Sequence, residues 1–325
     1  MKRLAQHILL NSGGLRMSEA IISCPFCGSV SSGIYLEGVT DLLHGTHGIW
    51  DIRECMSCGL LYTSPAIPEE RMGEYYPAEY AAHVGGNEGY GHPFIRFLKV
   101  LAILPYTLRF GQPGYFPQPF GKAEMLDVGC GAGLHIRKMS SLGWRCMGVD
   151  ISMQAIGNAR RLNPDAKFVV GLLRDIDSGE KFDLISMHHV LEHLYHPRQV
   201  IADCYSLLRP GGKLVVNVPN VASFEAGLFG RRWIGLDIPR HMLHFKEAVL
   251  VRLLKEAGFE IETKRPGMFS SSISESLIMC LPAWLRNKVF HSRVARIVYI
   301  LLVPVAAISY FLGNRGTVEI VALKN

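Results

Sequence analysis

The chain has 325 residues and a mass of 36.1 kDa, which suggests about two domains. Hydrophobic residues make up 49% and charged residues 19% of it, which excludes a disordered or purely solvating chain. The net charge of +6 is unevenly placed: residues 1–92 carry five basic and ten acidic residues, whereas residues 231–325 carry fourteen basic and seven acidic ones. An N-terminal third with this negative charge would repel phosphates, so we do not expect nucleic acid as a partner.

Two closely spaced pairs of cysteines lie near the N-terminus. Each pair has the pattern CxxC and is followed by glycine, and 27 residues separate the pairs. Four thiolates can close a tetrahedral Zn²⁺ site, and the segment between them is long enough for a β-hairpin. We therefore predict that residues 1–80 form a zinc-ribbon-like module with a structural zinc. Its predicted ligands are Cys24, Cys27, Cys55 and Cys58.

The first residues favour a cytoplasmic chain. Their apolar run covers only Ile8, Leu9 and Leu10, which is too short for the core of a signal peptide. In a reducing compartment, paired cysteines indicate a metal rather than disulfides.

Residues 81–122 are predicted to connect two domains. A glycine-rich break covers 81–92, and a stretch rich in glycine and proline covers 111–122. Between them, 93–110 are apolar with three basic residues and no acidic one, which predicts a basic amphipathic helix.

From residue 123 the pattern alternates between strands and helices, which predicts a parallel, doubly wound α/β sheet. Ser152 is a plausible helix N-cap, and Gly143 and Gly258 lie where helices should end. The predicted strands are 124–128, 145–150, 167–170, 182–187, 212–218, 259–265 and 317–323. The predicted helices are 134–142, 152–161, 198–208 and 246–257.

A glycine-rich turn follows the first of these strands. Gly129, Gly131 and Gly133 precede a helix, and Asp150 ends the next strand, where an acid can accept hydrogen bonds from both hydroxyls of a ribose. Asp127 lies two residues before the turn. Its negative charge suits a ligand that carries an ammonium group and disfavours a pyrophosphate, so the pattern points to S-adenosylmethionine (SAM) rather than NAD.

Four segments in order resemble the motifs of class I SAM-dependent methyltransferases: MLDVGCGAG, GVDIS, FDLISMHHVLEHLYHP and LLRPGGKLVVNVPN. The resemblance covers roughly 200 residues and implies a Rossmann-like, seven-stranded, mostly parallel sheet with an antiparallel last strand, spanning residues 123–325. The cofactor-binding residues that it implies are Asp127, Gly129, Gly131, Gly133, Asp150, Ile151, Leu172, Leu173 and His188, with Asp175 as a weak candidate near the adenine amino group. In this motif the pair Glu192–His193 is more often structural than catalytic.

The methyl acceptor is expected beyond the carboxyl end of the fifth strand, where RRWIGLDIPRHMLHF covers 231–245. This segment resembles a stretch of methyltransferases found among saccharide-modifying enzymes. We predict His241 or His244 as the base, and Arg232 and Arg240 as ligands of an anionic group on the acceptor. The alternative for each histidine is a helix cap or packing in the core.

The cysteine module, with CGLLYTSP and EYYPAEY, resembles the N-terminal zinc module of sugar C-methyltransferases from polysaccharide gene clusters, where the module helps to cover the acceptor site. By this resemblance Tyr75, Tyr76 and Tyr80 reach the cleft, with Tyr76 as the predicted substrate-binding residue; packing under the linker is the alternative. Some ribosomal-RNA guanine methyltransferases also carry a four-cysteine knuckle.

An apolar insertion, 267–315, separates the last two predicted strands, and Ile297–Gly313 contains 17 residues without a charge. Because both flanking strands belong to one sheet, a single membrane span is excluded. Residues 286–313 either lie on a membrane surface, with basic residues toward anionic lipid, or pack on protein.

The sequence thus predicts a zinc-containing SAM-dependent methyltransferase that acts on a small or lipid-linked acceptor, most simply a saccharide of a surface polymer, in the cytoplasm or at the inner face of its membrane. The alternatives are an RNA methyltransferase, a ubiquinone-type O-methyltransferase and a non-catalytic SAM-binding protein. The oligomeric state stays open.

Overall fold

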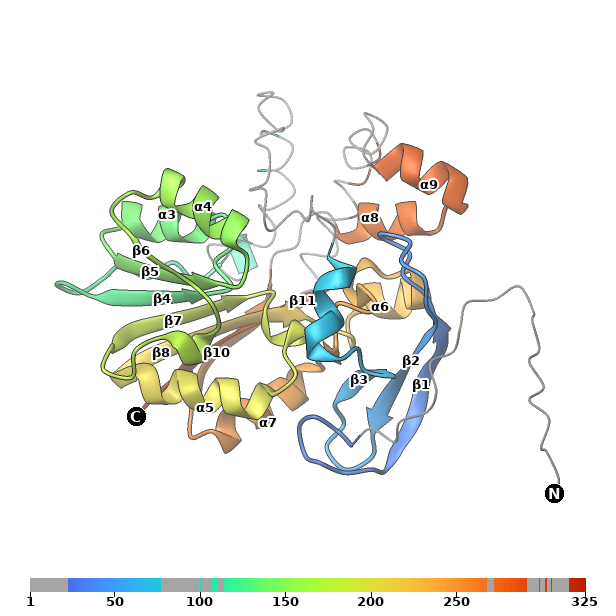
Figure 1. Cartoon of the computed structure of the whole chain (residues 1–325), viewed down its shortest axis with the longest axis horizontal. Helices are drawn as coiled ribbons and strands as arrows, with labels where there is room; N and C mark the ends of the chain where they lie inside the picture. Colours follow the sequence, from blue (N-terminus) through green and yellow to red (C-terminus); the bar gives the residue numbers. More distant parts are fainter. Residues whose placement is uncertain are drawn as a thin grey trace, which may run out of the picture.

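A seven-stranded sheet and a four-stranded sheet form the protein in the computed structural model (Figure 1). The structure describes residues 23–76, 114–267, 272–290 and 316–325, together with single positions between 97 and 109 and between 298 and 305. The predicted helix over 93–110 and most of 291–315 therefore lie outside the described residues.

The larger sheet has the strand order β10-β11-β8-β7-β4-β5-β6. Neighbouring strands are parallel except that β11 is antiparallel to both β8 and β10, as predicted. The seven strands are β4 (Glu124–Val128), β5 (Arg145–Asp150), β6 (Lys167–Val170), β7 (Phe182–His188), β8 (Leu208–Pro219), β10 (Glu260–Pro266) and β11 (Thr317–Leu323).

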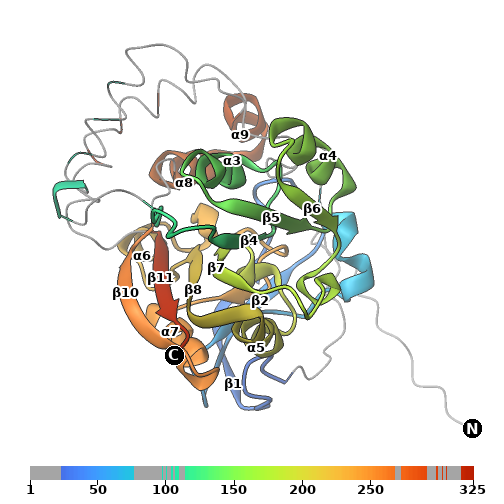
Figure 2. The same cartoon turned by 90° about the vertical axis from the view of Figure 1, so that its left-hand side faces the viewer.

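Helices cover both faces of this sheet, α3 and α4 on one and α5 and α7 on the other (Figure 1, Figure 2). Successive strand residues point to opposite faces, so Met125 packs in one apolar cluster with α3 and Leu126 in a second cluster with α5 and α7. Ser152 caps α4 by accepting the N–H of Ala155. These helices are α3 (Leu134–Ser141), α4 (Met153–Leu162), α5 (Pro197–Leu207) and α7 (Glu247–Glu256).

The smaller sheet contains strands from both predicted domains. β1 (Ser32–Val39) and β2 (Trp50–Cys55) form the predicted hairpin, and β3 (Leu61–Ser64) follows as the third antiparallel strand. The fourth strand, β9 (Leu243–His244), comes from the segment after β8. The N-terminal module and the larger domain therefore share a sheet and one continuous apolar core.

Short helices bring the site-forming segments together. Between β3 and β4 lies η1 (Glu69–Tyr75); η2 (Leu173–Asp175) and η3 (Leu191–His193) follow β6 and β7. After β8 the chain forms α6 (Phe224–Phe229), η4 (Gly230–Arg232) and η5 (Ile234–Leu236).

Two helices of the predicted insertion, α8 (Ser272–Met279) and α9 (Ala283–Phe290), pack on protein. Ile278 and Met279 form a cluster with Val289, against which Leu42 and Leu43 of the N-terminal module pack. Of the helices in the described ranges, none has the length and apolar character needed to cross a bilayer.

Candidate active site

The glycine turn after β4 has a backbone that other residues would not tolerate. Gly129, Gly131 and Gly133 have φ angles of +67°, +52° and +78°, in the left-handed region. A Cβ at Gly129 would overlap the Val190 side chain, and one at Gly133 would lie 2.6 Å from Asn163 Nδ2. The turn thus passes closely under the segment after β7 and ends at the N-terminus of α3.

Asp150 ties this turn to the end of β5. Its Oδ2 accepts the N–H of Gly131 at 2.9 Å, and its Oδ1 accepts the N–H of Ser152 at 2.8 Å. Each carboxylate oxygen keeps a lone pair, which two vicinal hydroxyls of a ribose can use. Ile151 beside it is 66% exposed, as a residue that would contact an adenine must be.

Asp175 bonds to the backbone of the segment after β6. Its Oδ2 accepts the N–H of Leu172 at 2.8 Å, so the carboxylate stabilises the turn that carries Leu172 and Leu173. Contact of Asp175 with an adenine amino group stays a prediction.

Asp127 and His188 lie at the other end of the turn. Asp127 is 3% exposed and accepts the hydroxyl of Ser186 at 2.7 Å, and burial raises its pKa. Burial lowers the pKa of His188 to about 3, and its ring centre lies 4.5 Å from that of His135. Within the described part of the chain, Nε2 of both histidines is buried without a hydrogen-bond partner.

A cluster of Glu192, His193 and His241 lies next to this turn, because Val190, which contacts Gly129, immediately precedes η3. One ligand atom from each of the three residues lies within 4.8 Å of the others. The N–H of Met242 donates to the Glu192 carbonyl at 2.9 Å, and this bond docks the segment after β8 onto η3. We call these three residues the Glu–His–His cluster.

The carboxylate of Glu192 is 1% exposed. Burial would raise its pKa, but the hydrogen bond from His189, at 3.2 Å, and the imidazoles around it lower the pKa to about 2. Burial lowers the pKa of His193 to about 4. From the sequence, the pair Glu192–His193 is expected to be structural more often than catalytic, and no local pattern places His241 beside it.

Arg240 is fully buried and held by two carboxylates. Its guanidinium lies 3.0 Å from Asp41 and 2.6 Å from Asp237, and it also donates to the Tyr75 carbonyl. The prediction that Arg240 binds an anionic acceptor is therefore contradicted, because its charge is neutralised inside the protein. Arg232, by contrast, is exposed on η4, beside a hollow that Asp41, Trp233 and Met279 also line.

His244 has a structural position in β9. Its Nε2 lies 3.1 Å from Thr63 Oγ1, and that hydroxyl donates to the His241 carbonyl at 2.7 Å. Thr63 Oγ1 must therefore accept a hydrogen bond from Nε2–H of His244, so Nε2 offers no lone pair to a substrate. Burial also lowers its pKa to about 3, and this placement contradicts a role as base.

Tyr76 connects the N-terminal module with the cluster. Its hydroxyl lies 2.9 Å from Nδ1 of His193, so the module reaches the edge at which the glycine turn also lies. Tyr75 packs edge-on against Trp50 instead, and Tyr80 lies outside the described residues.

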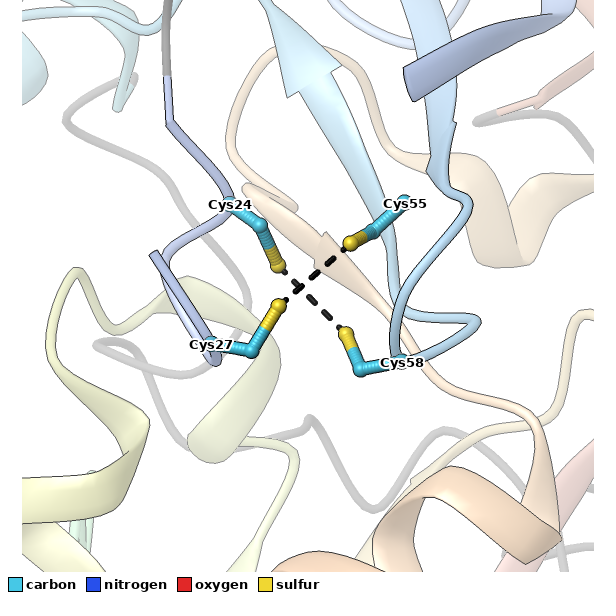
Figure 3. A group of neighbouring side chains, drawn as sticks. All are labelled: Cys24, Cys27, Cys55 and Cys58. Atoms are coloured by element: carbon cyan, nitrogen blue, oxygen red, sulfur yellow. Dashed lines mark hydrogen bonds between the residues drawn. The ribbon is translucent and has the colours of Figure 1, made fainter. Parts of the chain in front are cut away.

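The four cysteines of the N-terminal module point toward one another (Figure 3). Sγ of Cys24 lies 3.5 Å from that of Cys58, and Sγ of Cys27 lies 3.5 Å from that of Cys55. Tetrahedral zinc with bonds of about 2.3 Å separates its sulfur ligands by roughly 3.8 Å, so the cage fits this ion. Gly28 and Gly59, with φ of +73° and +77°, close the two turns by donating to the Cys24 and Cys55 carbonyls.

Comparisons with known proteins agree with this geometry. A family model described as a methyltransferase domain matches residues 99–264, just over half of the chain. The ubiquinone biosynthesis O-methyltransferase of Xanthomonas axonopodis pv. citri is 31% identical over 157 residues, which cover 45% of this chain and 65% of that protein. The enzyme of the same name from Cereibacter sphaeroides is 29% identical over 171 residues, 49% of this chain and 69% of the relative.

Among solved structures, a SAM-dependent methyltransferase from Mesorhizobium loti matches with 17% identity and a TM-score of 0.46, over 70% of this chain and all of that one. The chain thus spans about two thirds of the length of the curated relatives named above. The family match includes the glycine turn, Asp150 and the Glu–His–His cluster. The chain belongs to the class I SAM-dependent methyltransferase family.

Proposed function

We propose that the protein transfers the methyl group of SAM to a small or lipid-linked acceptor, and that this acceptor is a saccharide. The observation that carries the proposal is the contact between the glycine turn and the segment of Val190, which places the Glu–His–His cluster beside the expected cofactor pocket. The reaction needs an acceptor nucleophile aligned with the methyl group and shielded from water.

Different residues of the cofactor pocket are proposed to contact different parts of SAM. Asp150 accepts the ribose hydroxyls, and Ile151, Leu172 and Leu173 flank the adenine. Asp127 and His188 lie toward the methionine end, where the buried carboxylate of Asp127 would meet an ammonium group. SAM supplies the activated methyl group, while the protein supplies position and a dry surrounding.

The acceptor is proposed to bind over the Glu–His–His cluster. Of the two histidines predicted to be catalytic, His241 belongs to this cluster and His244 does not. The Tyr76 hydroxyl brings the N-terminal module to this cluster, which supports the proposal that the module covers the acceptor. Exposed Arg232, at the rim of the neighbouring hollow, is the residue that would meet an anionic part of the acceptor.

The cysteine cage is proposed to hold a structural zinc. The ion would fix the turns on either side of the β1–β2 hairpin, and β3, which follows the second turn, carries Thr63 to the carbonyl of His241. A zinc in this cage would thereby support the geometry of the site from a distance.

A second candidate acceptor is a ubiquinone-type phenol, because the curated relatives reported above are ubiquinone biosynthesis O-methyltransferases. Both candidates are compatible with a lipid-linked substrate. An RNA acceptor is disfavoured by the acidic N-terminal module.

The test is transfer from methyl-labelled SAM to separate saccharide, lipid and RNA fractions. We expect label in the saccharide or lipid-linked saccharide fraction, with its loss in His241→Ala and its retention in His244→Gln, both variants still binding SAM. Label in RNA alone would contradict the proposal, and label in a quinone precursor alone would favour the second candidate.

A further inference from the structure

The Glu–His–His cluster has a tautomer pattern that the backbone fixes. Nδ1 of His241 lies 2.9 Å from the Gly235 carbonyl, and Nδ1 of His193 lies 3.0 Å from the Arg240 carbonyl. A carbonyl oxygen can only accept, so Nδ1 of His241 carries the proton and Nε2 of its neutral ring offers a lone pair. The same tautomer of His193 donates from Nδ1 to the Arg240 carbonyl, with the Tyr76 hydroxyl 2.9 Å from that nitrogen as a second neighbour. Histidines that bind metals are oriented in this way by backbone carbonyls.

Glu192 adds a third lone-pair donor to the same place. Its Oε1 lies 3.9 Å from Nε2 of His241, which is too far for a hydrogen bond. Its Oε2 is buried and, within the described part of the chain, has no hydrogen-bond partner. A buried carboxylate with an unpartnered oxygen is unfavourable unless a cation or a proton donor meets it.

The buried charge of Arg240 does not fill that role. The guanidinium of Arg240 is engaged by Asp41 and Asp237, and Arg240 turns its carbonyl, not its charge, toward His193. His189 satisfies only Oε1 of Glu192. A free base at His241 would use one imidazole, and it would leave the half-buried imidazole of His193 and the unpartnered Glu192 oxygen without a function.

We propose that Glu192, His193 and His241 bind a divalent cation of the type that prefers nitrogen and oxygen ligands, such as Mn²⁺, Fe²⁺ or Zn²⁺. Two imidazoles and one carboxylate are a common ligand set for these ions, and they leave coordination positions open. Asp237, whose Oδ2 lies 3.9 Å from Nε2 of His241, is close enough to serve as a further ligand after a small shift. The ion's role rests on the proposed function: an acceptor oxygen bound to it would be more acidic and fixed in position.

The experiment is a titration of Mn²⁺ into the full-length, zinc-loaded protein. Binding is measured as the loss of the free-ion signal in electron paramagnetic resonance. Thiolates select softer ions, so Mn²⁺ reports on the Glu–His–His cluster and not on the cysteine cage. We expect one Mn²⁺ per chain, and binding at least about tenfold weaker in Glu192→Gln and His241→Ala. His244→Gln is the matched control, because His244 is equally buried but bonds to Thr63; its Mn²⁺ binding should be unchanged.

Circular dichroism and SAM binding establish that each variant is folded. The proposal is overturned if folded wild-type protein binds no Mn²⁺, or if Glu192→Gln binds it as tightly as wild type. Methyl transfer that persists in a chelator, together with absent Mn²⁺ binding, would reject the ion and leave the proposed function standing. Mn²⁺ binding without any methylated product would support the ion site and reject the proposed function.

Discussion

The guanidinium of Arg240 donates to both carboxylate oxygens of Asp41, each at 3.0 Å, although 199 positions separate the two residues in the sequence. Asp41 also accepts the backbone N–H groups of Leu43 and His44, so it organises the loop between β1 and β2. This bidentate pair joins the N-terminal module to the residue that precedes His241.

The first prediction concerns this ion pair. Asp41→Ala leaves a buried guanidinium with one partner fewer, and removing one member of such a pair destabilises by about 3–5 kcal/mol. Denaturant unfolding should show that loss, whereas exposed Glu74→Gln should change stability little. An Asp41→Ala protein as stable as Glu74→Gln would contradict the role of the pair.

The same carboxylate predicts a dependence of stability on pH. Burial would raise the pKa of Asp41, but the hydrogen bond and charge of Arg240 lower it from 3.8 to about 2. A lowered pKa in the folded state stabilises above the ordinary value, and that contribution is lost as pH falls from about 4 toward 2. The difference in stability between wild type and Asp41→Ala should shrink over this range; a constant difference would argue against the ionised pair.

The second prediction tests the glycine turn. Gly129→Ala combines a φ of +67° with an overlap on Val190, so SAM binding should be lost or strongly weakened. Gly157→Ala is the control, because Gly157 lies within α4 with open space around its Cβ position. That variant should bind SAM normally and gain about 0.5–1 kcal/mol of helix stability. Equal binding by both variants would show that the turn does not contact the cofactor.

The third prediction concerns zinc. The full-length protein should contain one zinc held by thiolates, detected by elemental analysis and by cobalt substitution. Cys24→Ser should lose the ion and loosen the module, and exposed Cys280→Ser should retain both. Retention of the thiolate-bound zinc by Cys24→Ser would contradict the four-cysteine site.

The fourth prediction concerns the surface near α9. Trp284 is 69% exposed, and Lys288 is exposed on the same helix, which suits the membrane-surface alternative for residues 286–313. The protein should sediment with phosphatidylserine vesicles at low salt, and Lys288→Glu should reduce the bound fraction. Lys167→Glu, an exposed lysine of β6, is the control. Failure of the wild-type protein to sediment would reject this contact.

Local patterns accounted for most of the fold. Alternating apolar strands, helix caps and glycines located the seven strands within a few residues, and the CxxC spacing identified the cysteine cage. The exception is β8, which begins at Leu208 rather than at 212 because Leu208 pairs with Phe182 of β7, ahead of an irregularity in the register. No local pattern reveals a pairing between residues so far apart in the sequence.

The same reason explains the errors at the candidate site. His241 and His244 are equivalent in the sequence, and the fold distinguishes them: Thr63, from the N-terminal module, bonds to Nε2 of His244, whereas Nδ1 of His241 bonds to the Gly235 carbonyl. In the sequence, Arg240 is a basic residue that could bind an anion. In the fold, Asp41 and Asp237 lie beside it and neutralise its charge. Roles set by partners more than 150 residues away depend on the tertiary fold.

The most direct measurement is calorimetric titration of SAM and its demethylated product into the purified, zinc-loaded protein, alongside Asp150→Asn. The account predicts one binding site per chain, and affinity roughly tenfold to hundredfold lower in the variant, because hydrogen bonds from the ribose to a charged carboxylate are lost. If the folded wild-type protein takes up neither nucleoside, the account of this protein as a methyltransferase is contradicted.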